Sequence, residues 1–301
     1  MKITKLEENL SISEGSFVRF KDMGNIKEVM FSATKSTGGY IKKLDKDKFV
    51  DLRSGEIKEF NHIENRSQDL SNVAKSLCMG RDIINTNVTD VSKCRWLTLT
   101  YKENMTDSKK LYYDFNNFLK RAREIFGHFE YITCAEPQGR GAWHLHCIFI
   151  FPDKAPYMAN DIVAKCWKKG FVTVKRLDDC DNVGAYLTAY LGDMDFTEFE
   201  KDNPNGCIGG IKEIEYKDEN GEIKTKKYIK GGRLNMYPAG FHIFRYSKGI
   251  KKPLVENIPY FEAKKKISSA KLTFSKSVLL SDIDNGFNNT LIYEYYNSIR
   301  K

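Results

Sequence analysis

Two histidines in one short segment are the residues of this chain best placed to do chemistry. His144 and His146 lie in the run Trp143–Phe151, which the sequence predicts to be a buried β-strand. Side chains at positions i and i+2 of a strand share a face, so both imidazoles point the same way. Burying two imidazole rings costs free energy unless their nitrogens bind a hydrogen-bond partner or a metal ion. A divalent metal ion would serve, because imidazole is a common metal ligand.

A metal site needs a further ligand, and Glu136 is the best candidate. It ends the preceding predicted strand. If the two strands pair antiparallel with residue numbers that add up to 280, Glu136 faces His144 and Cys134 faces His146. A slip of one residue would send Glu136 to the other face, and Gln138 in the connecting loop is the alternative ligand. Two imidazoles and a carboxylate suit Mg²⁺ or Mn²⁺ acting as a Lewis acid on a phosphate oxygen, although the set alone also admits Zn²⁺. The competing explanation is structural: two histidines with satisfied hydrogen bonds at a strand edge.

Two tyrosines further along the chain have the spacing that puts them on one face of a helix. Tyr186 and Tyr190 occur in the run Val183–Asp193, which is predicted to be helical, and their Cβ atoms would lie about 5–6 Å apart. A tyrosine hydroxyl can act as a covalent nucleophile when the developing charge is stabilised, for example by a metal ion on the phosphate. The alternative is ordinary amphipathic packing, with Val183, Tyr186 and Tyr190 as a core stripe.

The elements that must position these residues alternate between strand and helix. Residues 94–193 predict the order β-α-β-β-α-β-α, the ferredoxin-like split βαβ arrangement with one helix appended. The predicted fold class is therefore α+β, with a central antiparallel sheet in which the first strand and one hairpin strand are central. Asp107 is the expected cap of the first helix, and Gly170 follows the second. The expected strands and helices, in chain order, span residues 95–101, 107–125, 128–134, 143–151, 158–168, 171–176 and 181–192.

The flanking segments carry weaker signals. Residues 17–60 look β-rich, and residues 65–86 carry the apolar stripe of a helix. Residues 211–217 and 222–230 flank Asn220-Gly221, the strongest short hairpin signal. The last 50 residues have little fold signal. The predicted organisation is a β-rich N-terminal extension with a helix, a core domain, and a mixed, partly β C-terminal extension, over residues 1–90, 91–194 and 195–301.

Composition narrows the class of protein. The 301 residues are 41% hydrophobic, which suits a soluble globular protein, and no apolar run approaches the roughly 20 residues of a membrane span. The net charge of +9 favours a polyanionic partner such as nucleic acid, although a lysine-rich surface from an AT-rich genome explains it equally well. The seven cysteines form no CxxC pair, which argues against a disulfide framework or a zinc ribbon, and Cys134 and Cys147 are expected in the core. No apolar signal-peptide core is present at the N-terminus, so the reducing cytosol is the expected location.

Three motifs resemble those of one family in their order and spacing. His144-Leu145-His146 matches a pair of histidines around an apolar residue. Trp96-Leu-Thr-Leu-Thr100 matches an upstream strand motif, and Val183-x-x-Tyr186-Leu187 matches a tyrosine motif on a downstream helix. With these motifs, residues 94–193 resemble the HUH endonucleases, specifically the rolling-circle replication initiators (Rep proteins) of small phages and plasmids. The tails of phage-type replication proteins are more loosely similar to residues 230–238 and 247–252.

The resemblance implies a function and a role for named residues. His144 and His146, with Glu136 as the third ligand, would hold Mg²⁺ or Mn²⁺. Tyr186 would attack a phosphodiester of single-stranded or supercoiled origin DNA, giving a 5′-phosphotyrosine link and a free 3′-OH for the host DNA polymerase. Tyr190 would act when the displaced circle is closed. The chain has no GxxxxGK[ST] motif, so a host helicase is a further expected partner in the cytosol of a bacterial host.

Departures from the family pattern leave choices open. Many single-tyrosine relatives carry Lys four residues after the nucleophile, where this chain has Tyr190, and this favours the two-tyrosine class. Asp193 stands where some two-tyrosine relatives have another Lys, so the basic residue that balances the phosphate is open. The candidate DNA-binding residues are Arg140, Thr98 and Thr100. The alternatives are a relaxase or single-strand transposase of the same chemistry, and a DNA-binding regulator that keeps the fold without catalysis.

Overall fold

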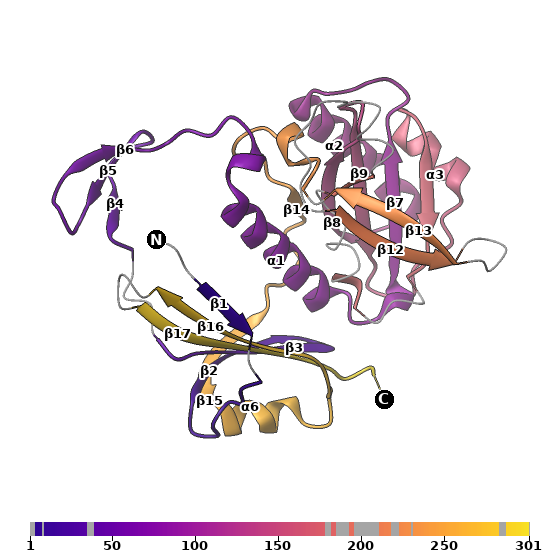
Figure 1. The fold of residues 1–301 in the computed structure, drawn as a ribbon. Helices are drawn as coiled ribbons and strands as arrows, with labels where there is room; N and C mark the ends of the chain where they lie inside the picture. Colours follow the sequence, from indigo (N-terminus) through magenta and orange to yellow (C-terminus); the bar gives the residue numbers. More distant parts are fainter. Residues whose placement is uncertain are drawn as a thin grey trace. The chain divides into compact units, whose positions relative to one another are not determined.

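The computed structural model of the chain divides into two units, each described here by itself (Figure 1). Residues 1–63 and 253–301 form one unit, and residues 64–252 form the other. The structure describes residues 4–7, 9–34, 39–177, 182–184, 193–195, 211–217, 223–229, 231–282 and 287–300.

This division differs from the three consecutive segments expected from the sequence. The reason is strand pairing between the two ends of the chain, because β17 (Phe287–Asn297) pairs with β3 (Ile26–Ser32). Helix α1 (Leu70–Asn87) and strand β14 (Phe244–Tyr246) were expected in the flanking segments, but both belong to the central unit.

The unit of residues 64–252 is built on a five-stranded sheet in the order β10-β7-β9-β8-β14, and each neighbouring pair is antiparallel. The four strands besides β14 are β7 Cys94–Thr100, β8 Glu130–Pro137, β9 Trp143–Ile150 and β10 Val172–Lys175. The first strand, β7, and the second hairpin strand, β9, are adjacent inside this sheet, as predicted. With helices between strands β7 and β8 and between β9 and β10, the predicted α+β class is confirmed.

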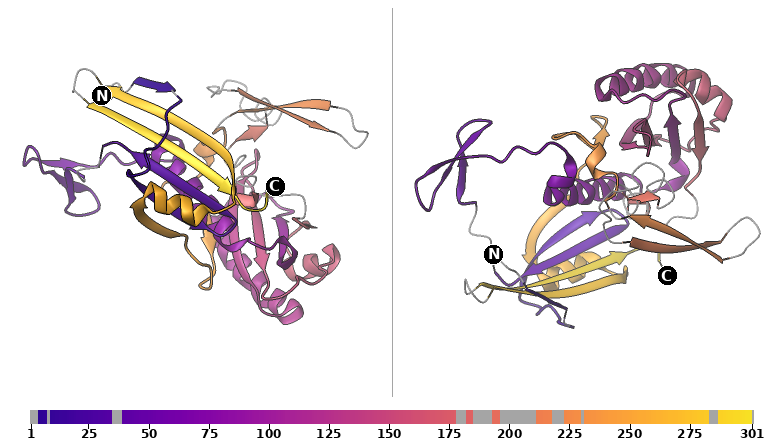
Figure 2. Two further views of the ribbon diagram at one scale, coloured as in Figure 1. Left: turned by 90° about the horizontal axis from the view of Figure 1, so that it is seen from below. Right: turned by 45° about the horizontal axis from the view of Figure 1, so that its top comes forward.

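Helices α2 (Ser108–Phe126) and α3 (Asn160–Trp167) pack on one face of this sheet (Figure 2). Phe118 of α2 lies with its ring centroid 6.0 Å from Phe149 of β9 and 5.9 Å from Trp167 of α3. Asp107 caps α2 as predicted, because its carboxylate accepts hydrogen bonds from two backbone N–H groups in the first turn.

Helix α3 ends one residue earlier than predicted, with Gly170 beyond its end as expected. The left-handed residue after this helix is Lys168, with φ of 61°, and not Gly170. Gly170 serves a different purpose, because a Cβ there would lie 2.3 Å from the carbonyl oxygen of Thr100. Its missing side chain lets the chain pass close to the end of β7.

Helix α1 packs on the opposite face of the sheet. A Cβ at Gly80 of α1 would lie 2.4 Å from the ring of Phe244. Phe244 is the Cα partner of Cys134 on β8, so it shares a face with alternate residues of that strand such as Glu136. The helix predicted over residues 65–86 is therefore confirmed, with a later start behind the cap residue Asp69.

Further short elements complete the unit of residues 64–252. The strand pair expected around Asn220-Gly221 is present as β12 and β13, although that turn itself lies outside the described residues. Strand β11 pairs with β13. The bounds are η1 Arg66–Gln68, η2 Val91–Lys93, β11 Met194–Asp195, β12 Ile211–Lys217, β13 Ile223–Ile229 and η3 Leu234–Met236.

The other unit is a six-stranded sheet in the order β1-β16-β17-β3-β2-β15, against which helix α6 packs (Figure 2). The hydroxyl of Tyr260 on α6 donates a hydrogen bond to the buried carboxylate of Glu294 on β17. The bounds not yet given are β1 Thr4–Glu7, β2 Phe17–Met23, β15 Leu254–Pro259, α6 Tyr260–Ile267 and β16 Lys271–Asp282. The C-terminal segment, which showed little fold signal, therefore holds three strands and a helix.

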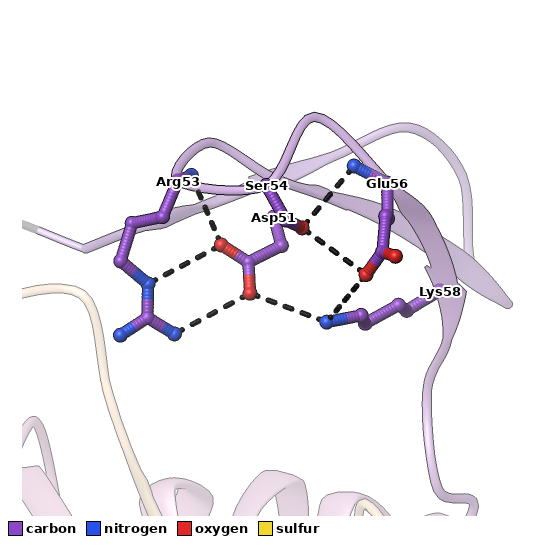
Figure 3. Close-up of polar contacts among 5 residues, drawn as sticks. All are labelled: Asp51, Arg53, Ser54, Glu56 and Lys58. Atoms are coloured by element: carbon purple, nitrogen blue, oxygen red, sulfur yellow. Dashed lines mark hydrogen bonds and ion pairs between the residues drawn. The ribbon is translucent and has the colours of Figure 1, made fainter.

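A small three-stranded sheet, β4-β5-β6, belongs to the same stretch of chain as β1 to β3. Its strands are Ile41–Lys43, Lys48–Asp51 and Ile57–Glu59. Asp51 accepts hydrogen bonds from Arg53 and Lys58 (Figure 3). The side-chain hydrogen bond from Arg53 is the main reason why the pKa of Asp51 falls to about 2, so this carboxylate stays ionised. Its hydrogen bonds to Arg53 and Lys58 stabilise the turn between β5 and β6.

The structure also shows the state of the cysteines and the character of the helices. The five described cysteines are free, and Cys134 and Cys147 are buried in the core as predicted. Within the described ranges, no helix has the length and apolar character needed to cross a membrane.

Candidate active site

The two histidines lie on β9, the middle strand of the five-stranded sheet. Glu136 of β8 is the Cα partner of His144, and Cys134 is the Cα partner of His146. Of the registers that the sequence left open, the hairpin has the one in which Glu136 faces His144. Directly paired residues of an antiparallel sheet project to the same side, so both imidazoles and the Glu136 carboxylate share one face.

Strand β7 brings two threonines to the same face. Thr98 is the Cα partner of His146, and Thr100 is the Cα partner of His144. The alternating residues Leu97 and Leu99 are fully buried and project to the opposite face. Core packing of the leucines thus decides which face of the sheet carries the polar group.

His146 is held on three sides. Its Nε2 lies 2.8 Å from Oε2 of Glu136, and its Nδ1 lies 3.3 Å from the hydroxyl oxygen of Thr98. The Trp96 ring stacks on the imidazole, with centroids 5.3 Å apart and an interplanar angle of 16°. With an ionised carboxylate as acceptor, Nε2 carries the proton and Nδ1 accepts from the threonine hydroxyl.

Glu136 is nearly buried but stays ionised. Burial raises the pKa of this carboxyl, but the hydrogen bond from His146 and the positive charge of Arg233 outweigh burial, so the net pKa is lowered. Its two oxygens have different partners, because Oε2 bonds to His146 and Oε1 forms an ion pair with Nη1 of Arg233.

His144 differs from its neighbour, because its Nε2 is buried and has no hydrogen-bond partner among the described residues. Its ring centroid lies 6.3 Å from that of His146, and the two planes are nearly perpendicular. Burial, followed by repulsion between the protonated forms of the two rings, lowers the pKa of His144 to about 4, although Glu136 acts in the opposite direction. The ring is therefore neutral at physiological pH, which is the form that binds metal ions.

Arg233 is a member of this site that the sequence alone did not single out. It pairs with Glu136, and the two side chains are only 14% and 13% exposed. Arg233 lies within the segment 230–238 that loosely resembles Rep tails, but one arginine among 49 lysines and arginines carries no distinguishing signal. Only the fold brings it to the carboxylate.

The segment after Arg233 is fixed to the sheet. The hydroxyl of Tyr237 donates a hydrogen bond of 3.0 Å to the carbonyl of Ala135 on β8, and Tyr237 is fully buried. Phe241 stacks on Trp143 at 4.7 Å between centroids. The chain then continues as β14 alongside β8. Arg233 is thus anchored on the C-terminal side by a buried hydrogen bond and an added strand.

The β8–β9 loop holds the other candidate residues Gln138 and Arg140. The Arg140 Nε donates to the side-chain oxygen of Gln138 at 3.2 Å, and its Nη2 donates to the carbonyl of Tyr101 at 3.0 Å. The Arg140 charge contributes to the lowered pKa of His144. Gln138 thus hydrogen-bonds to the loop arginine, and the carboxylate beside the histidines comes from Glu136.

Tyr186 and Tyr190 lie outside the described residues. The residues just before them are described: Val183 is buried, and the N–H of Gly184 donates to the side-chain oxygen of Asn85 on α1 at 3.0 Å. Helix α1 packs on the face that carries the histidines, so the approach to the tyrosine segment is fixed on that side of the sheet.

The donor set fits a divalent ion in chemistry, with two imidazoles, one ionised carboxylate and a buried His144 nitrogen that lacks a partner among the described residues. The side chains are not arranged as ligands around one point, and the described part of the chain has no group of three or more His, Cys, Asp or Glu residues so arranged. The two carboxylate oxygens of Glu136 bond instead to His146 and Arg233. An ion held by His144, His146 and Glu136 would replace the His146–Glu136 hydrogen bond.

The comparisons with known proteins point to replication. Residues 94–195 match the model of a family described as replication-associated protein, and this match covers about a third of the chain, from β7 through the tyrosine segment to β11. No match was found among curated proteins or among solved structures. The family match supports a role in replication initiation.

Proposed function

We propose that this protein initiates rolling-circle replication by nicking and joining single-stranded origin DNA through a covalent 5′-phosphotyrosine intermediate. The observation that carries the proposal is the shared face of His144, His146 and Glu136 inside the segment that matches the replication-associated family. The strand order β10-β7-β9-β8, with α2 and α3 on the opposite face, supports a ferredoxin-like split βαβ core of the HUH type.

The proposed chemistry is a transfer of the phosphodiester to tyrosine. The hydroxyl oxygen of Tyr186 attacks the phosphorus and loses its proton, the P–O3′ bond breaks, and the DNA leaves as a free 3′-OH that takes up a proton. The 3′-OH primes the host DNA polymerase while a host helicase opens the duplex. Tyr190 performs a second transfer of the same kind, and attack by a 3′-OH on the phosphotyrosine closes the circle.

His144, His146 and Glu136 would hold Mg²⁺ or Mn²⁺ for this reaction. Such an ion supplies a Lewis acid that stabilises charge on the phosphate oxygens. Thr98 keeps the His146 imidazole oriented through Nδ1, and Thr100 and Arg140 are proposed to contact the DNA backbone.

The test is a covalent-adduct assay with overlapping single-stranded oligonucleotides that tile the genetic element encoding this chain. Each oligonucleotide is labelled at its 3′ end, because a 5′-phosphotyrosine link retains that half of the DNA. The protein is incubated with the oligonucleotides and Mn²⁺ and run on a denaturing gel. We expect one oligonucleotide to give a labelled protein band, which Tyr186→Phe abolishes and Tyr113→Phe leaves unchanged. Tyr113 is the matched control, because it lies on α2 and is 68% exposed.

Other outcomes separate the alternatives. A band lost only in Tyr190→Phe would reverse the order of the two tyrosines. Binding without an adduct under any divalent metal would favour the non-catalytic DNA-binding regulator. Adduct formation at a transfer origin or at a transposon end, with none at a replication origin, would favour a relaxase or a single-strand transposase.

A further inference from the structure

The Arg233 guanidinium occupies a position next to the proposed metal ligands that neither the motifs nor the family match accounts for. It pairs with Oε1 of Glu136, while His146 takes Oε2 of the same carboxylate. All three side chains are less than 20% exposed. In such a desolvated group the charges act on one another strongly, and none of the three can change partner without affecting the others.

The backbone holds Arg233 in this place from both sides. On its N-terminal side, the N–H of Gly231, a residue with φ of 70°, donates to the carboxylate of Asp193 at 2.9 Å. On its C-terminal side, η3 leads to the buried Tyr237–Ala135 hydrogen bond. These contacts fix the backbone on either side of Arg233, so its side chain stays within reach of Glu136.

The charge balance defines what this arginine can do. The Glu136 carboxylate and the Arg233 guanidinium that pairs with it carry one charge each, of opposite sign. A divalent cation on His144, His146 and Glu136 would add two positive charges beside Arg233, and like charges at such distances oppose binding. An incoming anion would restore the balance. A DNA phosphate suits this role, because the planar guanidinium fork matches two phosphate oxygens.

We propose that Arg233 is a positioning residue that couples metal binding to DNA binding. It holds the Glu136 carboxylate in the metal-free protein, and it turns to a backbone phosphate of the DNA when metal and single-stranded DNA are bound together. This inference rests on the proposed function. It implies that metal and DNA each bind more tightly in the presence of the other.

The test measures Mn²⁺ affinity from the loss of the free-ion signal in electron paramagnetic resonance, with and without a short oligothymidylate. A Tyr186→Phe, Tyr190→Phe background prevents cleavage. In this background with Arg233 intact, we expect DNA to tighten Mn²⁺ binding about 10-fold. We expect Arg233→Gln to bind Mn²⁺ about 10-fold more tightly without DNA, because a competing charge is lost, and to show little further gain from DNA. A merely structural role for Arg233 would weaken Mn²⁺ binding in this variant.

Two further variants sharpen the test. Arg245→Gln is the matched control for net charge, because Arg245 is an exposed residue of β14 paired with Thr133 and projects from the opposite face of the sheet. It is expected to keep both the original affinity and the full coupling. Arg233→Lys keeps the positive charge but loses the planar guanidinium fork. In the absence of DNA, it should bind Mn²⁺ with the same affinity as the protein with Arg233 intact. The gain in Mn²⁺ affinity on adding DNA should be mostly lost. This variant retains the ion pair with Glu136 and decides the matter if Arg233→Gln does not fold.

The contrary results fall into two distinguishable groups. Unchanged or weaker Mn²⁺ binding in Arg233→Gln, or full coupling in Arg233→Lys, overturns the role of Arg233 and leaves the proposed function standing. A protein with Arg233 intact that binds no Mn²⁺, with or without DNA, overturns the metal site of the proposed function and this inference with it.

Discussion

Glu136 pairs through the backbone with His144 but bonds through its side chain to His146. The Cα register sets Glu136 opposite His144, whereas Oε2 reaches diagonally to Nε2 of His146 at 2.8 Å. This diagonal contact leaves the buried Nε2 of His144 without a partner among the described residues. The two histidines of one motif therefore differ in the hydrogen bonds that they contribute to the fold.

Removing either histidine should affect metal binding equally but stability unequally. His146→Ala removes a hydrogen-bond partner from a buried carboxylate and should lower the free energy of unfolding by about 1–3 kcal/mol. His144→Ala breaks no hydrogen bond of the imidazole Nε2 and should cost less than about 1 kcal/mol. Urea denaturation without metal measures both.

The same variants test metal binding through thermal denaturation. Mn²⁺ should raise the Tm of the unaltered protein, because a ligand that binds only the native state stabilises it. It should fail to do so for either site variant. His128→Ala is the control, because His128 is 71% exposed and pairs with Glu130. An equal rise in Tm for His144→Ala would contradict its role as a ligand.

The buried pair of Glu136 and Arg233 should show strong energetic coupling. Glu136→Gln removes the carboxylate from this buried ion pair and should destabilise the protein by about 3 kcal/mol. The double variant Glu136→Gln, Arg233→Met removes both charges of the pair, so the two effects should be non-additive by about 1–3 kcal/mol. A double-mutant cycle by urea denaturation measures the coupling, and additive effects would show that the pair contributes little.

Gly184 should tolerate no side chain. A Cβ there would lie 2.5 Å from the side-chain oxygen of Asn85 and 2.6 Å from the carbonyl of Arg81. Gly184→Ala should therefore destabilise the protein by about 1–3 kcal/mol and reduce adduct formation, because it displaces the approach to the tyrosine segment from α1. Gly15→Ala is the matched control, since nothing lies within 4 Å of its Cβ position. Wild-type stability and adduct yield in Gly184→Ala would refute the anchoring role.

Two buried thiols should make the protein lose stability at alkaline pH. Burial raises the pKa of Cys94 and of Cys147 to about 12, against 9.0 for a free thiol. The folded state therefore holds these protons more tightly than the unfolded state. Their stabilising effect is complete below pH 9 and is lost as pH rises toward 12, at about 1.4 kcal/mol per pH unit for each thiol. Urea denaturation between pH 8 and 11 checks this, and a Cys94→Ala, Cys147→Ala variant should depend on pH less steeply.

The sequence sufficed for the features that depend on local pattern. The apolar strand patterns and the short glycine loop between them were enough to predict the β8–β9 hairpin, but the register that sets Glu136 opposite His144 was one of the choices left open. Helix α2 begins where its cap residue Asp107 indicates. In both cases the residues that carry the signal lie within a few positions of the element that they determine.

Features that depend on distant parts of the chain could not be predicted. Strand β17 pairs with β3, which lies more than 250 residues earlier in the chain. Nothing in the sequence of β17 itself indicates which strand it pairs with. Arg233 pairs with Glu136 from the segment that leads into β14, which joins the sheet beside β8. In both cases a non-local strand pairing sets the position of the residues, and a single sequence carries no local sign of it.

The most direct test of the central claim is to identify the amino acid that becomes linked to DNA. The adduct formed with Mn²⁺ is digested with protease and nuclease, and the modified peptide is sequenced by mass spectrometry. The proposed function predicts a nucleotide 5′-phosphate on the hydroxyl of Tyr186, with modification lost in His144→Ala. A nucleotide on a residue other than Tyr186 or Tyr190, or undiminished modification in His144→Ala, would contradict it.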